Sequence, residues 1–230
     1  MKSVNQAEQL QKEGRIHIRN EQETDYRLVE EITRNAFYNL YVPGCTEHYL
    51  THIMREHHDF IPELDFVIEL DGQVVGNVMY TKAKLVDEDG NQKEILTFGP
   101  VSIAPEHQRK GLGKLLLEHS FQQALLLGYD VIVIFGNPGN YVSRGFQSCI
   151  KYNVSLEEGV YPAAMMVKEL KPGVLGSKKW TYYDSPVMHQ IEEAEAERFD
   201  REFEPAEKKH QPSQEEFYIL SHAVLQKETN

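Results

Sequence analysis

The order of apolar and polar positions in the first hundred residues predicts one strand, two helices and a meander of strands. Residues 15–19 alternate in polarity, as a half-buried strand does. Residues 24–40 are expected to form an amphipathic helix, because apolar side chains recur there every four positions, at Leu28, Ile32, Ala36 and Leu40. A second helix is expected at 47–58. Residues 64–103 predict three antiparallel strands, since Asp71-Gly72 between apolar runs is typical of a hairpin.

The next stretch predicts a helix and a second buried strand. In residues 111–128 the buried stripe of the helix is expected to consist of Leu117, Phe121 and Ala124, with Leu116 and Leu127 beside it. Residues 129–136 are almost wholly apolar, which is typical of a strand covered on both faces. With the strand that ends at 103 they predict a βαβ unit with parallel strands. Residues 149–155 and 163–170 are expected to supply the last strands.

The composition of the chain changes after residue 170. Residues 180–185 predict one more strand, 189–203 an acidic helix, 204–214 a polar linker and 215–225 a short helix. We therefore expect one domain at 1–170 and a C-terminal extension at 171–230 that packs on or beside it.

The bulk composition limits the class of protein. The chain has 230 residues, 40% of them hydrophobic and 26% charged, which suits a soluble globular domain with an appendage. It contains no apolar run of 18 residues, and its first residues lack the apolar core of a secretory signal, so we expect no membrane span. Two cysteines make no disulfide framework, which favours a cytoplasmic location.

The net charge of −12 argues against a nucleic-acid partner, because duplex binders usually carry a basic face. The acidity is strongest at 192–204, where carboxylates outnumber arginines. A solvated helix face is the simpler interpretation of this segment, and attraction of a cationic substrate is the alternative.

The stretch QRKGLGK at 108–114 stands where a strand ends and a helix begins. The first N–H groups of a helix have no partner, and glycines let phosphate oxygens approach them closely. Cations flank both glycines, so the stretch predicts a diphosphate cradle. It is neither a P-loop nor a dinucleotide fingerprint, because leucines occupy positions 115 and 116. On these residues alone, a basic surface loop remains the alternative.

Two motifs together resemble those of the GCN5-related N-acetyltransferase (GNAT) superfamily. VSIAPEHQRKGLGKLLLEHS at 101–120 is similar to the family motif in which [QR]-x-x-G-x-[GA] follows the fourth strand and opens a helix. NPGNYVSRGF at 137–146 is similar to the second family signature. The resemblance covers residues 15–170. The extension, with W-x-Y-Y and E-x-F-D patterns, resembles that of a poorly characterised bacterial subgroup of this superfamily.

The resemblance implies a fold and a co-substrate. The fold is α/β (α+β): a mixed, mostly antiparallel central sheet of about seven strands, flanked by helices, with splayed fourth and fifth strands. Acetyl-CoA would lie in the split, with its pantetheine arm on the backbone of Val101 and Ile103 and in contact with Asn137. Its diphosphate would lie against the cradle, whose residues are Gln108, Arg109, Lys110, Gly111, Leu112, Gly113 and Lys114. No metal is implied.

The resemblance also implies an enzyme, an N-acetyltransferase in which a primary amine attacks the thioester directly. Tyr141 matches the tyrosine that stabilises or protonates the leaving thiolate, and a packing role is the alternative. Thr97 stands where some members have a glutamate base, and it cannot act as one. The acceptor, a small molecule or a protein amine, is expected at residues 37–60. A non-catalytic acyl-CoA sensor or interaction module is the alternative function, and a homodimer is left open.

Overall fold

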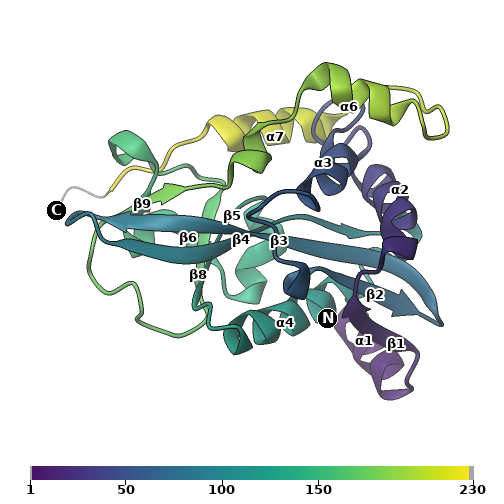
Figure 1. The fold of residues 1–230 in the computed structure, drawn as a ribbon, viewed down its shortest axis with the longest axis horizontal. Coiled ribbons are helices and arrows are strands. Elements are labelled where there is room, and N and C mark those ends of the chain that lie inside the picture. The colour runs from purple at the N-terminus through teal and green to yellow at the C-terminus, as the bar shows by residue number, and fades with distance from the viewer. Residues whose placement is uncertain (1, 228–230) are drawn as a thin grey trace.

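The computed structural model describes residues 2–227 and has one central mixed sheet (Figure 1). Its main path runs β1-β2-β3-β4-β5-β8-β6, while β9 pairs with both β3 and β7. The β4–β5 and β7–β9 pairs are parallel and the other pairs are antiparallel. The strands are β1 Ile16–Asn20, β2 Phe66–Leu70, β3 Gln73–Asp87, β4 Gln92–Ile103, β5 Val131–Phe135, β6 Gln147–Ser148, β7 Val154–Ser155, β8 Met165–Glu169 and β9 Trp180–Tyr183.

The sheet splits between β4 and β5. Strand β4 pairs with β3 along almost its whole length, with a register shift beside Gly99-Pro100. Against β5 it makes only the pairing of Leu96 with Ile132, so the two strands separate beyond that point. A proline removes one ladder donor, which is consistent with an irregular strand at this position. The expected splayed fourth and fifth strands and the parallel βαβ unit are confirmed.

Helices cover both faces of the sheet (Figure 1). The face under α4, called the α4 face, carries Tyr80, Leu96, Phe98, Ile132 and Ile134. The opposite face, called the α3 face, carries Met79, Ala83, Ile95, Val131 and Val133, because side chains alternate along a strand. The helices are α1 Lys2–Lys12, α2 Tyr26–Phe37, α3 Glu47–Met54, α4 Leu112–Leu126, α5 Pro138–Tyr141, α6 Glu193–Asp200 and α7 Pro212–His222. Among the described residues, no helix is both long and apolar enough to cross a membrane.

Three local expectations from the sequence are wrong. In α2 the buried apolar side chains are Val29 and Ile32, whereas Leu28 is 42% exposed. At the end of α4, Leu127 is exposed rather than buried. Residues 149–155 form a 3₁₀ turn and a two-residue strand, because Asn153 adopts a left-handed conformation that interrupts an extended chain.

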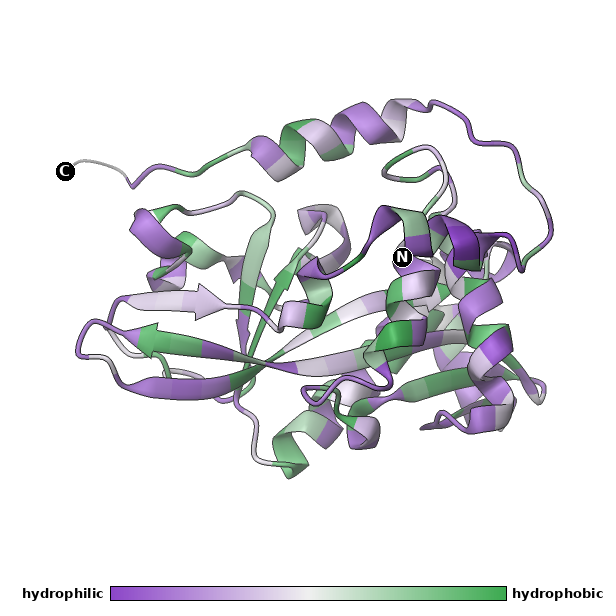
Figure 2. Cartoon of the chain, turned by 45° about the horizontal axis from the view of Figure 1, so that its top comes forward, coloured by the Kyte–Doolittle hydropathy of each residue, from purple (hydrophilic) through white to green (hydrophobic). Residues whose placement is uncertain are grey.

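The C-terminal extension contacts the rest of the chain through several elements, among them β9 and α6. Strand β9 pairs with the second half of β3, with Tyr182 opposite Leu85. Helix α6 binds α2 through Asp200, whose carboxylate accepts a 2.6 Å hydrogen bond from Arg34 Nε. Helix α7 runs along the top of the molecule with polar and apolar residues around it (Figure 2), and no residue of it is buried.

Candidate functional site

The turn between β4 and α4 exposes a row of free backbone donors. Gly111 is the N-cap residue of α4 and has φ +92°, a conformation that glycine adopts without strain. In the described part of the chain, the N–H groups of residues 109–113 have no hydrogen-bond acceptor. They lie at the N-terminal end of a 15-residue helix, where the helix dipole adds positive potential. This arrangement can bind an anion with several oxygen atoms.

Cations surround these donors, as the sequence predicts. Arg109 is exposed, and Lys110 Nζ donates to the Glu106 carbonyl at 2.6 Å. Lys114 Nζ lies 3.3 Å from Glu8 of α1 and 3.6 Å from Glu118. A bound anion would therefore compete with two carboxylates for Lys114. No sequence pattern indicated that α1 reaches this site.

Gln108 lies at the turn but makes an internal bond. Its Nε2 donates to the carbonyl of Ile103 at 3.0 Å, which ties the end of β4 to the turn. Val101 lies on the part of β4 beyond Leu96, where no β5 residue pairs with it. The backbone there is an unpaired strand edge on the β5 side, which an extended ligand with amide groups can join.

Tyr141 is the last residue of α5 and lies beside the split. Its ring lies 5.8 Å from the rings of both Phe98 and Phe146 on the α4 face. Gly136 makes this position available, because a Cβ there would come within 2.7 Å of the Tyr141 ring. Burial raises the pKa of Tyr141 to about 12, so the phenol is protonated at neutral pH and can donate a proton or a hydrogen bond.

Asn137 follows β5 and caps α5. Its Oδ1 accepts a 2.9 Å hydrogen bond from the N–H of Gly139, and the side chain is exposed. The carbonyl of the amide is thus engaged by the protein, while its NH₂ group is available to a ligand. Asn137 and Tyr141 therefore belong to one short element at the end of β5.

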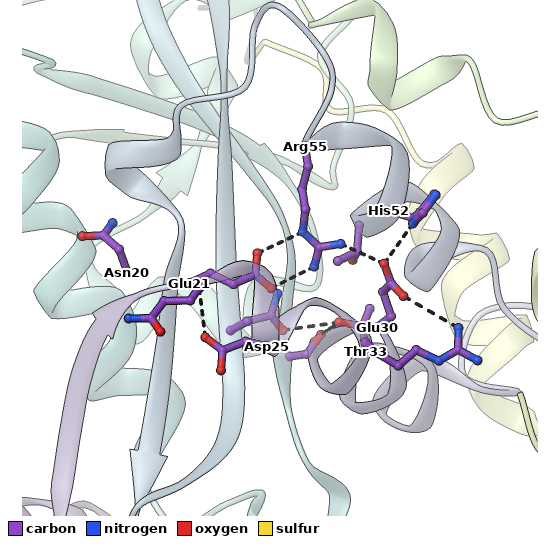
Figure 3. A network of polar contacts seen from close by, with 12 residues as sticks. Asn20, Glu21, Asp25, Glu30, Thr33, His52 and Arg55 are labelled. Atoms are coloured by element: carbon purple, nitrogen blue, oxygen red, sulfur yellow. Dashed lines mark hydrogen bonds and ion pairs between the residues drawn. The ribbon is translucent and has the colours of Figure 1, made fainter.

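A buried ionic network fixes α2 and α3 to the end of β1 (Figure 3). Arg55 donates to Glu21 at 3.0 and 2.8 Å and to Glu30 at 2.8 Å. His52 Nδ1 lies 3.0 Å from Glu30. The side chain of Glu21 is completely buried, so the network positions the two helices that cover the α3 face.

His48 and His52 lie one helical turn apart, but their ring nitrogens lie beside different carboxylates. His48 is fully buried between the rings of Phe199 and Phe203 of the extension. Burial lowers the pKa of His48 to about 4. Its Nε2 lies 3.2 Å from Asp200, so this residue joins α3 to α6.

The loop between α2 and α3 lies under α7. Tyr41 stacks on Phe217 of α7 at a centroid distance of 4.5 Å. Ser213 Oγ donates to the carbonyl of Leu40 at 2.8 Å, and the N–H of Leu225 donates to the carbonyl of Tyr161 at 2.8 Å. Helix α7 is thus held at both of its ends, and it covers residues that were expected to form the acceptor site.

Comparisons with known proteins agree on one family. Residues 34–147 match the model of the acetyltransferase (GNAT) family. A curated relative, the uncharacterized N-acetyltransferase YjhQ of Escherichia coli K12, is 28% identical over 89 residues. That alignment covers 38% of this chain and 48% of YjhQ, so the match spans about half the length of the relative.

Two solved structures share the fold. The GNAT family N-acetyltransferase YhbS from Escherichia coli, in complex with CoA, superposes with a TM-score of 0.66 at 21% identity, over 77% of this chain and 94% of YhbS. A GNAT family acetyltransferase from Brucella melitensis, in complex with acetyl-CoA, gives a TM-score of 0.58 at 22% identity, over 75% of this chain and 97% of that one.

Proposed function

Because this chain belongs to the GNAT acetyltransferase family, we propose that it transfers the acetyl group of acetyl-CoA to a primary amine. The observation that carries the proposal is the row of free N–H groups at residues 109–113, beside the unpaired edge of β4. Both features are what a diphosphate joined to an extended amide chain requires.

In this proposal the co-substrate lies along the split. Its diphosphate accepts hydrogen bonds from the N–H groups between Arg109 and Lys114, and the cations of the cradle balance its charge. The pantetheine amides pair with the β4 backbone at Val101 and Ile103, and the NH₂ group of Asn137 contacts the same arm. Gln108 stabilises the cradle indirectly, because its side chain donates a hydrogen bond to the carbonyl of Ile103 and so fixes the turn to the end of β4.

The chemistry is a direct attack of a neutral amine on the thioester carbonyl. The C–N bond forms, the C–S bond breaks, and the electron pair goes to sulfur. Tyr141 then gives its proton to the thiolate. Its buried phenol is protonated at neutral pH, so it can first stabilise the anionic sulfur by donating a hydrogen bond to it.

The acceptor belongs on the side of α2, α3 and α7. The loop that holds Tyr41 lies there, under Phe217. A chain of net charge −12 favours a cationic amine over an anionic acceptor. A small amine and the N-terminus of a protein both fit this description.

Turnover tests the proposal. CoA release is measured with phenethylamine, spermidine and a peptide with a free N-terminus as acceptors. We expect release above the hydrolytic background with at least one of them, and about a 10²-fold lower kcat for Tyr141→Phe. The matched control is Tyr152→Phe, which removes a hydroxyl far from the split. Acetyl-CoA binding without turnover of any of the three amines would favour a non-catalytic sensor.

A further inference from the structure

The α3 face carries buried polar groups at the point where β4 and β5 separate. Thr81 of β3 and Thr97 of β4 are register neighbours there, and both are buried. Thr81 Oγ1 and Tyr182 Oη have no hydrogen-bond partner in the part of the chain that the structure describes. A buried polar group without a partner lowers stability, because folding removes its hydrogen bonds to water and does not replace them. Two such atoms on one sheet face therefore indicate a place where a bound molecule supplies the missing partner.

Tyr182 reaches this place from the C-terminal extension. Its backbone is paired with Leu85 of β3, and its ring lies 6.0 Å from the ring of Phe135. Phe135 is the last residue of β5 and is 46% exposed, so it marks the open end of the split. Thr97 and Asp184 lie near the Tyr182 hydroxyl, although neither side chain makes a hydrogen bond with it in this structure. Tyr141 packs against Phe98 on the other face, so the two phenols lie on opposite sides of the sheet.

Asp184 and His189 connect the surroundings of the Tyr182 hydroxyl with solvent. The Asp184 carboxylate is almost buried and accepts a 2.8 Å hydrogen bond from the N–H of Ser185. Its Oδ2 lies 3.3 Å from His189 Nε2, and the His189 side chain is 71% exposed. Burial raises the pKa of Asp184, while the Tyr182 hydroxyl and His189 act in the opposite direction. A carboxylate whose pKa is raised toward neutral pH is a better proton acceptor at that pH than one with an ordinary pKa.

We propose that Tyr182, Asp184 and His189 of the extension carry protons from the acceptor amine to solvent. This inference rests on the proposed acetyl transfer. It assigns the base that sequence patterns leave open, because Thr97 cannot take up a proton. It also places the acceptor nitrogen on the α3 face, where the unpaired hydroxyl of Tyr182 contacts it.

The proton transfers balance over the reaction. An N–H bond of the ammonium breaks, Tyr182 Oη takes that proton, and the proton of Tyr182 passes to Asp184 and through His189 to solvent. After the C–N bond forms, the cationic nitrogen loses a second proton by the same route. The thiolate takes its proton from Tyr141, which regains one from solvent. The sum is one amide, one CoA thiol and one released proton.

Tyr182 acts in this scheme as a neutral relay. Burial, with a contribution from Asp184, raises its pKa well above the ordinary phenol value, so it does not persist as a phenolate. Four further charged groups face Asp184 or its surroundings, among them Glu94, which lines the same cavity as Asp184. Asp59 accepts a 2.8 Å hydrogen bond from Ser185 Oγ, and Lys82 and Lys84 line the same cavity. Their charges contribute to the pH dependence of turnover at this site.

The test compares Tyr182→Phe and Asp184→Asn with a neighbouring control. Tyr182→Phe keeps the ring against Phe135 and removes the hydroxyl. Tyr183→Phe makes the same change on the next residue, whose ring lies near Lys84 instead. Acetyl-CoA binding is measured by titration calorimetry. Turnover is followed from pH 6 to 10 with whichever of phenethylamine, spermidine and the peptide is acetylated fastest.

We expect Tyr182→Phe and Asp184→Asn to lower kcat by about 10²-fold or more at pH 7, with an unchanged acetyl-CoA Kd. The loss shrinks as pH rises, because the amine then loses its proton in solution. His189→Gln is expected to lower kcat by a smaller factor, and added imidazole is expected to restore the kcat of this variant. If Tyr182→Phe and Asp184→Asn both keep the turnover and the pH profile of the wild type, the relay is overturned and the proposed function is not affected. A wild type that neither binds acetyl-CoA nor turns over would overturn the proposed function and the relay with it.

Discussion

Arg55 holds two buried carboxylates, and its removal tests how α2 and α3 are fixed over the α3 face. The change Arg55→Met keeps an apolar side chain of comparable length and removes three hydrogen bonds, two to Glu21 and one to Glu30. The exposed fractions of the three side chains are 6%, 0% and 6%. Water therefore cannot replace the lost donors without opening the helix pair.

The expected magnitude follows from that burial. Breaking a buried ion pair on one side costs about 3–5 kcal/mol, because it leaves an uncompensated buried charge. The matched control is Arg15→Met. The two hydrogen bonds from Arg15 to Asp71 are as short, at 2.7 and 2.6 Å, but both side chains are half exposed. Solvent screens that pair, so little change in stability is expected there.

The assay is urea unfolding of the three proteins at pH 7, followed by circular dichroism and tryptophan fluorescence. We expect a much lower unfolding midpoint for Arg55→Met and a midpoint near that of the wild type for Arg15→Met. Equal midpoints in the two variants would refute the reasoning, because bond length rather than burial would then decide the energy.

Four further results are expected. Burial and the neighbouring Glu21 raise the pKa of Asp65 to about 9, so the folded state holds the extra proton between about pH 4 and 9. Stability therefore falls as pH rises through that range, and urea midpoints at pH 5 and 8 should show a smaller fall in Asp65→Asn. Phe146→Ala should cost about 3–5 kcal/mol in urea unfolding, because the ring is fully buried in the aromatic cluster. Ellman's reagent should modify Cys45 and Cys149 slowly in the folded protein and quickly in urea, because burial raises the pKa of both thiols. Gly136→Ala should lower kcat more than it alters acetyl-CoA binding, because a methyl group there displaces the Tyr141 ring.

Local signals predicted the framework well where they were strong. The pair Asp71-Gly72 marked the β2–β3 hairpin. The helix expected at 111–128 is α4, and Gly128, with φ +96°, follows its last turn. The glycines at 111 and 113 stand at the strand-to-helix junction that their pattern indicated. Each of these features depends on backbone conformations that a few residue types favour, so neighbouring residues suffice to reveal them.

Features that depend on distant contacts could not be read from the sequence. The spacing of Leu28 and Ile32 suggested one helix face, but α2 turns Val29 inward because that side faces the sheet. Tyr182 lies over Phe135 only because β9 pairs with the far half of β3. Glu8 meets Lys114 for a similar reason, since α1 packs beside α4. No local pattern encodes such pairings between segments a hundred residues apart.

The cradle at the start of α4 is the central claim, and titration calorimetry with acetyl-CoA tests it most directly. The variant Gly113→Glu places a carboxylate among the free N–H groups, and the backbone has room for its Cβ, which would meet Ile103 at 3.6 Å. Gln122→Glu adds the same charge on an exposed position farther along α4 and serves as the control. We predict micromolar binding by the wild type and Gln122→Glu, and at least 10-fold weaker binding by Gly113→Glu. Equal affinities for all three proteins, or no binding by the wild type, would contradict the account.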